Sequence, residues 1–158
     1  MSSFALLLLV GLTLFSVVGC TKAATTTSYV PQTRNFTIAT VATLTNEQAA
    51  AVPSYAPVVQ KMGEDYSFSP DVITVYQGDT VNLDIYNLQP DDPHTFSLTG
   101  PYGNVNVTIE ANTDQKVSFV ASSVGEFEFH CLEPGHLPFM YGELIVLPAS
   151  MGVADPSK

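Results

Sequence analysis

Short segments in which apolar and polar residues alternate follow one another from Tyr66 to Leu147, with turn residues between them. In the clearest of them, Val81, Leu83 and Ile85 alternate with polar residues. A period of two puts the apolar side chains on one face of a strand, and about eight short strands at this spacing are typical of two packed sheets. The sequence therefore predicts an all-β sandwich. The strands are expected at residues 66–70, 72–76, 81–85, 96–98, 105–109, 117–120, 127–131 and 143–147.

A short helical insertion is predicted at residues 45–62, after a further strand at residues 35–44. Thr45 and Gln48 have the spacing of a capping box, three alanines follow, and Pro53 ends the helix. A second helical turn is expected after Ser54. The pattern assigns no chemistry to this insertion.

Residues 1–19 have the pattern of an export signal. The apolar stretch from Phe4 to Val18 is short for a transmembrane span, and the residues up to Cys20 resemble a lipoprotein cleavage box in which Cys20 carries the lipid. No Lys or Arg precedes Phe4, so an uncleaved anchor and an ordinary signal peptide remain alternatives. All three place the folded part outside the cytoplasm, at the outer face of the cytoplasmic membrane or in the periplasm.

The rest of the chain divides into three parts. Residues 20–34 are rich in Thr, Ala and Ser and predict a flexible tether. Residues 35–149 form the predicted domain, and residues 150–158 a C-terminal tail. The expected assembly state is a monomer.

The charge balance narrows the range of partners. The chain has 15 acidic and 5 basic residues, for a formal net charge of -10. This excess argues against nucleic acid as a partner and favours partners with a basic docking face.

Only two cysteines are present, Cys20 at the signal junction and Cys131 in the last third of the chain. Cys131 therefore has no expected disulfide partner, although export compartments favour disulfides. A lone thiol there is expected to be buried or bound to a metal, and its neighbours favour a metal.

Potential metal ligands are concentrated around Cys131. His136 and Met140 follow it within ten residues, and a loop with Pro134 and Gly135 turns the chain between them. A thiolate, an imidazole and a thioether together suit copper in both of its oxidation states. His94 is the candidate for a second imidazole, because His130 alternates with Cys131 and should point outward with Glu126 and Glu128.

The spacing Cys-x4-His-x3-Met, with Pro-Gly before the histidine, resembles the azurin and auracyanin branch of the cupredoxins, the type 1 blue copper proteins. The segments Phe68-Ser69-Pro70 and Gly78-Asp79-Thr80-Val81 are similar to cupredoxin opening strands, and Pro93-His94 is similar to plastocyanin. The resemblance covers roughly residues 66–147 and implies a Greek-key β-sandwich.

By this resemblance, one copper ion is held in a trigonal plane by His94, Cys131 and His136, with Met140 as a weak axial ligand. The backbone N–H groups of Thr95 and Glu133 are expected to hydrogen-bond the thiolate sulfur. Pro93 stands where azurins have a glycine, so a fifth ligand is not implied.

The function implied is that of an electron carrier, not an enzyme. Its partners would be cytochromes or membrane oxidase or reductase complexes. Two surfaces are candidates for electron exchange. One is acidic and contains Glu126, Glu128 and His130. The other is apolar, near His136, and contains Leu137, Pro138 and Phe139.

Three other functions compete with the carrier. A multicopper oxidase or copper nitrite reductase needs more histidines than the 3 in this chain. A binuclear copper domain needs a second cysteine in the loop, where Glu133 and Pro134 stand. A copper chaperone or storage lipoprotein stays open as the alternative function, although such proteins use several methionines or cysteines.

Overall fold

The computed structural model describes residues 29–136 and 138–149. The predicted signal at residues 1–19, the predicted lipid attachment at Cys20, the first part of the tether, Leu137 and the tail at residues 150–158 lie outside the described residues.

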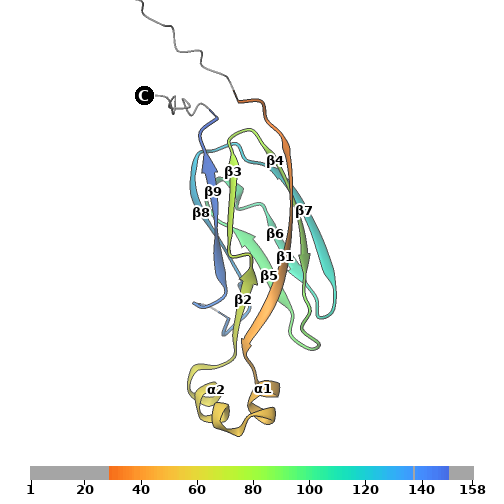
Figure 1. Ribbon diagram of the computed structural model, residues 1–158, viewed down its shortest axis with the longest axis vertical. Helices are drawn as coiled ribbons and strands as arrows, with labels where there is room; N and C mark the ends of the chain where they lie inside the picture. Colours follow the sequence, from red (N-terminus) through yellow and green to blue (C-terminus); the bar gives the residue numbers. More distant parts are fainter. Residues whose placement is uncertain (1–28, 137, 150–158) are drawn as a thin grey trace, which may run out of the picture.

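A four-stranded and a five-stranded sheet pack face to face in the described part of the chain (Figure 1). The first has the strand order β2-β1-β4-β7 and the second β3-β9-β8-β5-β6. The predicted all-β sandwich is therefore confirmed. The strands are β1 (Thr33–Leu44), β2 (Asp65–Ser69), β3 (Val72–Tyr76), β4 (Thr80–Tyr86), β5 (His94–Leu98), β6 (Asn106–Ile109), β7 (Asp114–Val120), β8 (Gly125–His130) and β9 (Tyr141–Leu147).

Five of the eight connections between successive described strands cross from one sheet to the other. β1 pairs with β4 and β3 pairs with β9, in both cases in parallel, while the remaining pairs are antiparallel. Parallel neighbours require crossover connections rather than hairpins. The sandwich is thus closed by contacts between distant parts of the chain.

The hydrophobic core lies between the sheets and follows the alternation seen in the sequence. Val81, Leu83 and Ile85 of β4 are at most 2% exposed, while the residues between them are partly exposed. Leu144 and Val146 of β9, in the other sheet, belong to the same buried cluster. Strand β5 differs, since all its residues are buried, including the polar ones.

Two short helices lie beyond one end of the sandwich (Figure 1). Helix α1 (Asn46–Ala51) begins at the capping box of Thr45 and Gln48, and the 3-10 helix η1 (Pro53–Tyr55) leads into α2 (Ala56–Met62). Glu64 accepts hydrogen bonds from the backbone and side chain of Asn46 and so joins the two ends of this segment.

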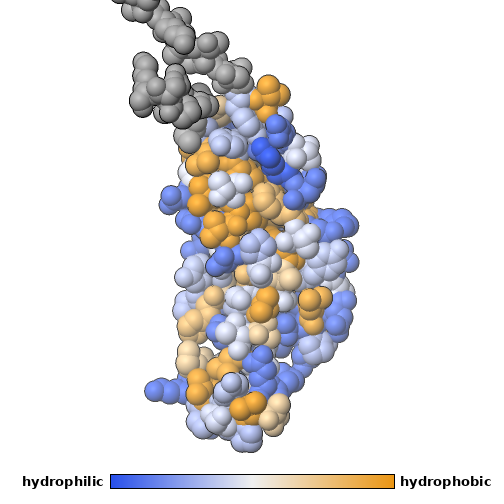
Figure 2. All heavy atoms as spheres, in the orientation of Figure 1, coloured by the Kyte–Doolittle hydropathy of each residue, from blue (hydrophilic) through white to orange (hydrophobic). Residues whose placement is uncertain are grey.

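The surface of the helical end carries exposed hydrophobic side chains, visible in the lower part of Figure 2. They are Val52, Tyr55, Val58 and Met62.

Among the described residues, no helix has the length and apolar character needed to cross a membrane.

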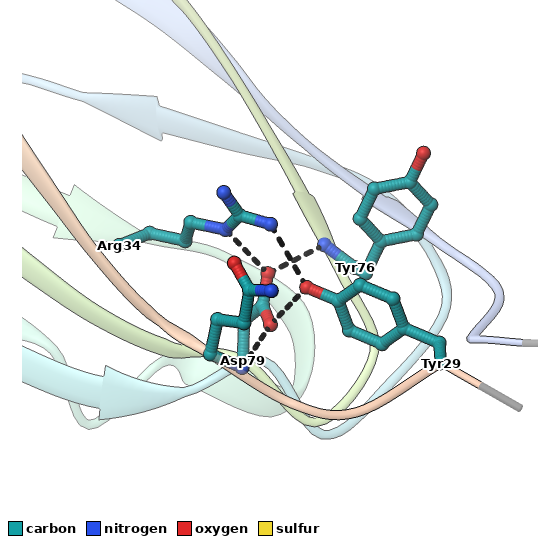
Figure 3. Close-up of polar contacts among 5 residues, drawn as sticks. Tyr29, Arg34, Tyr76 and Asp79 are labelled. Atoms are coloured by element: carbon teal, nitrogen blue, oxygen red, sulfur yellow. Dashed lines mark hydrogen bonds and ion pairs between the residues drawn. The ribbon is translucent and has the colours of Figure 1, made fainter.

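The buried carboxylate of Asp79 binds the start of the domain (Figure 3). It lies at the end of the sandwich away from the helices (Figure 1). One oxygen of Asp79 accepts hydrogen bonds from the Tyr29 hydroxyl, at 2.6 Å, and from the backbone N–H of Gln32, at 2.8 Å. The other accepts from Arg34 Nε and from the backbone N–H of Tyr76, both at 3.1 Å. The tether predicted to run to residue 34 therefore ends earlier, because from Tyr29 onward the chain is bound to the sandwich.

The surroundings of Asp79 favour its ionised form. Burial raises the pKa of this carboxyl, but the hydrogen bonds from Tyr29, Gln32, Tyr76 and Arg34 outweigh that effect and lower the pKa from 3.8 to about 2. A carboxyl whose pKa falls on folding stabilises the fold fully above its unfolded pKa, and this contribution is lost as the pH falls through its folded pKa.

Asp79→Asn should therefore lower the free energy of unfolding by about 2–4 kcal/mol at neutral pH, because it removes a buried charge and leaves its donors poorly paired. Denaturant unfolding measures this loss. The wild type should also lose stability between pH 4 and pH 2 more steeply than the variant. The matched control is Asp84→Asn, which breaks an exposed ion pair with Lys116 and should cost less than about 1 kcal/mol. Equal losses for the two variants would contradict this role of Asp79.

Candidate metal centre

Three side chains from separate parts of the second sheet meet at the helical end of the sandwich. His94 is the first residue of β5, Cys131 directly follows β8, and His136 lies in the loop that leads to β9. Strands β5 and β8 are hydrogen-bonded neighbours, with Ser97 opposite His130, so the start of β5 lies beside the end of β8. The sheet itself therefore brings His94 next to Cys131.

The ligand atoms form a compact triangle. His94 Nδ1 and His136 Nδ1 are 3.2 Å apart, and Cys131 Sγ lies 3.4 Å from His136 Nδ1 and 3.9 Å from His94 Nδ1. The centre of such a triangle is about 2.0 Å from each corner, close to the length of metal–nitrogen bonds and slightly below that of metal–sulfur bonds. All three residues are buried. The triangle thus has the size of a single three-ligand metal site.

The Cys131 thiol is held as a thiolate. Burial raises its pKa, but hydrogen bonds with His136 and His94 and from the backbone N–H groups of Thr95 and Glu133 lower it to about 5. The same interaction with Cys131 raises the pKa of His136. A thiolate is the form of cysteine that binds metals, so the protein presents this ligand ready at neutral pH.

Thr95 connects the two segments that carry the ligands. Its backbone N–H donates to Cys131 Sγ at 3.3 Å, and its hydroxyl oxygen accepts from the backbone N–H of Leu132 at 2.6 Å. The neighbouring Pro93 is partly buried before the strand begins. Thr95 thereby fixes the distance between His94 and Cys131.

The loop between β8 and β9 closes on itself around His136. The backbone N–H of Cys131 donates to the Met140 carbonyl at 3.0 Å, and the Met140 N–H donates to the His136 carbonyl at 3.0 Å. Gly135 has φ of 89°, a left-handed conformation that favours glycine. Met140 is 0% exposed, on the same loop as Cys131 and His136.

Tyr66 also belongs to the site, although sequence analysis did not single it out. Its ring centroid lies 4.8 Å from that of His94 and 4.8 Å from that of His136. Its hydroxyl donates to the carboxylate of Asp92, two residues before His94. Tyr66 follows Met62, the last residue of α2, by four residues, and nothing in its sequence position marks it as a neighbour of the ligands.

The outward residues predicted next to Cys131 lie apart from the metal triangle. His130 has an 18% exposed side chain, and its Nδ1 lies 3.1 Å from Glu128 Oε1 without hydrogen-bond geometry. Glu126 and Glu128 line a groove of about 580 Å³ on the outer face of the sheet. Two further carboxylates, Asp71 and Glu143, and two aromatic residues, Phe139 and Tyr141, also line it.

Glu128 and Glu143 face each other directly across β8 and β9. Like charges in opposed positions destabilise a strand pair. Among the described residues, no Lys or Arg is paired with either glutamate. The groove is therefore a concentrated acidic surface on strand β8, which Cys131 directly follows.

A β-sandwich that brings a buried cysteine and two histidines together at one end of a sheet has the donor set of a protein that binds one metal ion. The family model described as a cupredoxin-like domain matches residues 35–146. This chain belongs to the cupredoxin-like family. No curated protein sequence is significantly similar to it.

Solved structures of copper proteins are similar to this chain at low sequence identity. Auracyanin A, a blue copper protein from Chloroflexus aurantiacus, is 20% identical with a TM-score of 0.49, over 72% of this chain and 98% of its own. A blue copper oxidase from Nitrosomonas europaea is 21% identical with a TM-score of 0.52, over 75% of this chain and 39% of its own. A copper nitrite reductase from Thermus scotoductus is 17% identical with a TM-score of 0.50, over 75% of this chain and 28% of its own.

The donor set decides which metal the site fits. Two imidazoles and a thiolate in one small triangle match a trigonal His2Cys site, the arrangement of blue copper centres. The family and the triangle together fit a single type 1 copper ion.

Proposed function

We propose that this protein is a type 1 copper electron carrier that exchanges single electrons with redox proteins outside the cytoplasm. The observation that carries the proposal is the buried triangle of His94, Cys131 and His136, whose ligand atoms lie within 4.8 Å of one another. Copper, when bound, supplies a one-electron couple between Cu(I) and Cu(II). The protein's contribution is to hold its ligands in one arrangement for both states.

The ligands are held from outside the triangle. Thr95 joins the His94 strand to the segment after Cys131, and the loop hydrogen bonds fix His136 relative to Met140. Met140 is proposed as the weak axial ligand, a role that a buried thioether on this loop suits. Ligands that barely move on oxidation keep the reorganisation small, which favours rapid electron transfer.

A carrier accounts for the histidines better than an enzyme does. The chain has 3 histidines. Two of them belong to the triangle, and His130 lies on the outer side of β8 beside Glu128. The multinuclear sites of copper oxidases need more imidazoles than these.

Two surfaces support docking of partners with a basic face. The acidic groove that contains Glu126 and Glu128 lies next to His130, which is covalently adjacent to the thiolate. Pro138 and Phe139 are exposed on the loop of His136, and Leu132 is 49% exposed beside Cys131. Long-range attraction would bring a basic cytochrome or a membrane oxidase or reductase to this acidic protein. Apolar contact would then shorten the path to copper.

We also propose attachment to the outer face of the membrane through lipid on Cys20. Asp79 binds Tyr29 and Arg34 at the end of the sandwich away from the helices (Figures 1 and 3). An anchor before Tyr29 would therefore leave the metal centre on the side that faces away from the anchored end.

Addition of Cu(II) to the metal-free protein should produce an intense visible band from charge transfer between thiolate and copper. Cys131→Ser should abolish this band and leave the far-ultraviolet circular dichroism unchanged. The control is Ser97→Ala, which alters a buried hydroxyl of the same β5 strand without touching a ligand. A folded wild type that binds Cu(II) without an intense band would favour a copper chaperone or storage protein instead.

Met140→Leu should retain copper but raise the reduction potential, because it removes a weak donor that stabilises Cu(II) more than an apolar side chain can. Protein-film voltammetry measures the potential. Met62→Leu is the matched control, since Met62 is 50% exposed on α2. The axial role of Met140 is refuted if both variants keep the wild-type potential.

A further inference from the structure

We infer that Tyr66 is a positioning residue of the metal centre, which holds both imidazoles at their bonding positions before a metal arrives. The inference rests on the copper site proposed above. Tyr66 is not among the proposed ligands and would act through the two histidines that are.

One phenol ring contacts both histidine ligands. Tyr66 is 0% exposed, and its ring meets that of His94 edge-on, at 67°, and that of His136 at a tilt of 48°. The two imidazole centroids are 5.0 Å apart, so the three rings pack as a single cluster. A change in the orientation of either imidazole would displace the tyrosine ring or leave a gap beside it.

His94 depends on this packing because its Nε2 has no polar partner among the described residues. Metal-binding histidines commonly donate their second N–H to a carboxylate, carbonyl or water, which fixes the ring orientation. In the described part of the chain, His94 Nε2 is buried without any hydrogen-bond partner. Packing must therefore orient the ring, and Tyr66 supplies an aromatic contact at 4.8 Å.

The hydroxyl of Tyr66 extends this support to the backbone that carries His94. It donates to the carboxylate of Asp92, two residues before the ligand. The carbonyl of Asp92 in turn accepts from Asn87 Nδ2 at 2.7 Å. Asn87 is itself buried and bound to Thr40 of β1. Asp92 is thus held through its side chain and its backbone at the same time.

Ring and hydroxyl can be separated by substitution. Tyr66→Leu removes the contact with both imidazoles, whereas Tyr66→Phe keeps the ring and loses only the bond to Asp92. Tyr102 offers a matched control, because it is a 3% exposed tyrosine packed on Phe119 and Phe127, with its hydroxyl bound to the backbone of Ser123. Tyr102→Leu should cost comparable stability without touching the ligands.

The test measures Co(II) affinity by absorption and the imidazole signals of the metal-free protein by NMR. For Tyr66→Leu we expect Co(II) affinity to fall by about 10- to 100-fold, with broadened or doubled signals from His94 and His136. Tyr66→Phe should show a smaller loss, and Tyr102→Leu should keep wild-type affinity and single signals.

The inference is overturned if Tyr66→Leu and Tyr102→Leu lose stability alike while Co(II) affinity and the imidazole signals stay as in the wild type. Equal losses of affinity in both variants would also overturn it, because the effect would then follow from general destabilisation. A wild type without the intense Cu(II) band would count against the electron carrier, whereas the Co(II) and NMR results would still decide the role of Tyr66.

Discussion

The interaction on which the rest of the site depends is that between a buried thiolate and two imidazoles. Cys131 is 0% exposed, and isolated burial would favour its neutral form. His94, His136 and two backbone N–H groups reverse that preference. An anionic sulfur inside an apolar sandwich is costly to form unless its hydrogen-bond partners are held in place. The start of β5 and the end of β8 hold them there.

The two ends of the sandwich carry different parts of the structure. The metal centre and the helices lie at one end of the sandwich, and the carboxylate of Asp79 binds the start of the domain at the other (Figure 1). Strand β1 runs the length between them, paired with β2 near the helices and with β4 toward Asp79. Under the proposed attachment through Cys20, the metal loop would lie at the end of the sandwich away from the membrane.

Much of this arrangement could be predicted from the sequence, since a period of two reports directly which side chains face the core. The same rule placed Cys131 inside and Glu128 outside, as the structure has them. It could not identify Tyr66, whose contact with His94 depends on how two sheets pack rather than on local spacing. Nor could it show that Asp79 is buried, because a charged residue in a turn sequence is ordinarily exposed.

X-ray absorption at the copper edge of the loaded protein, in its oxidised and reduced forms, tests the central claim most directly. The account predicts one short bond to sulfur and two bonds to nitrogen of about 2.0 Å, with little change between the two oxidation states. A first shell without sulfur, or one that rearranges on reduction, would contradict it.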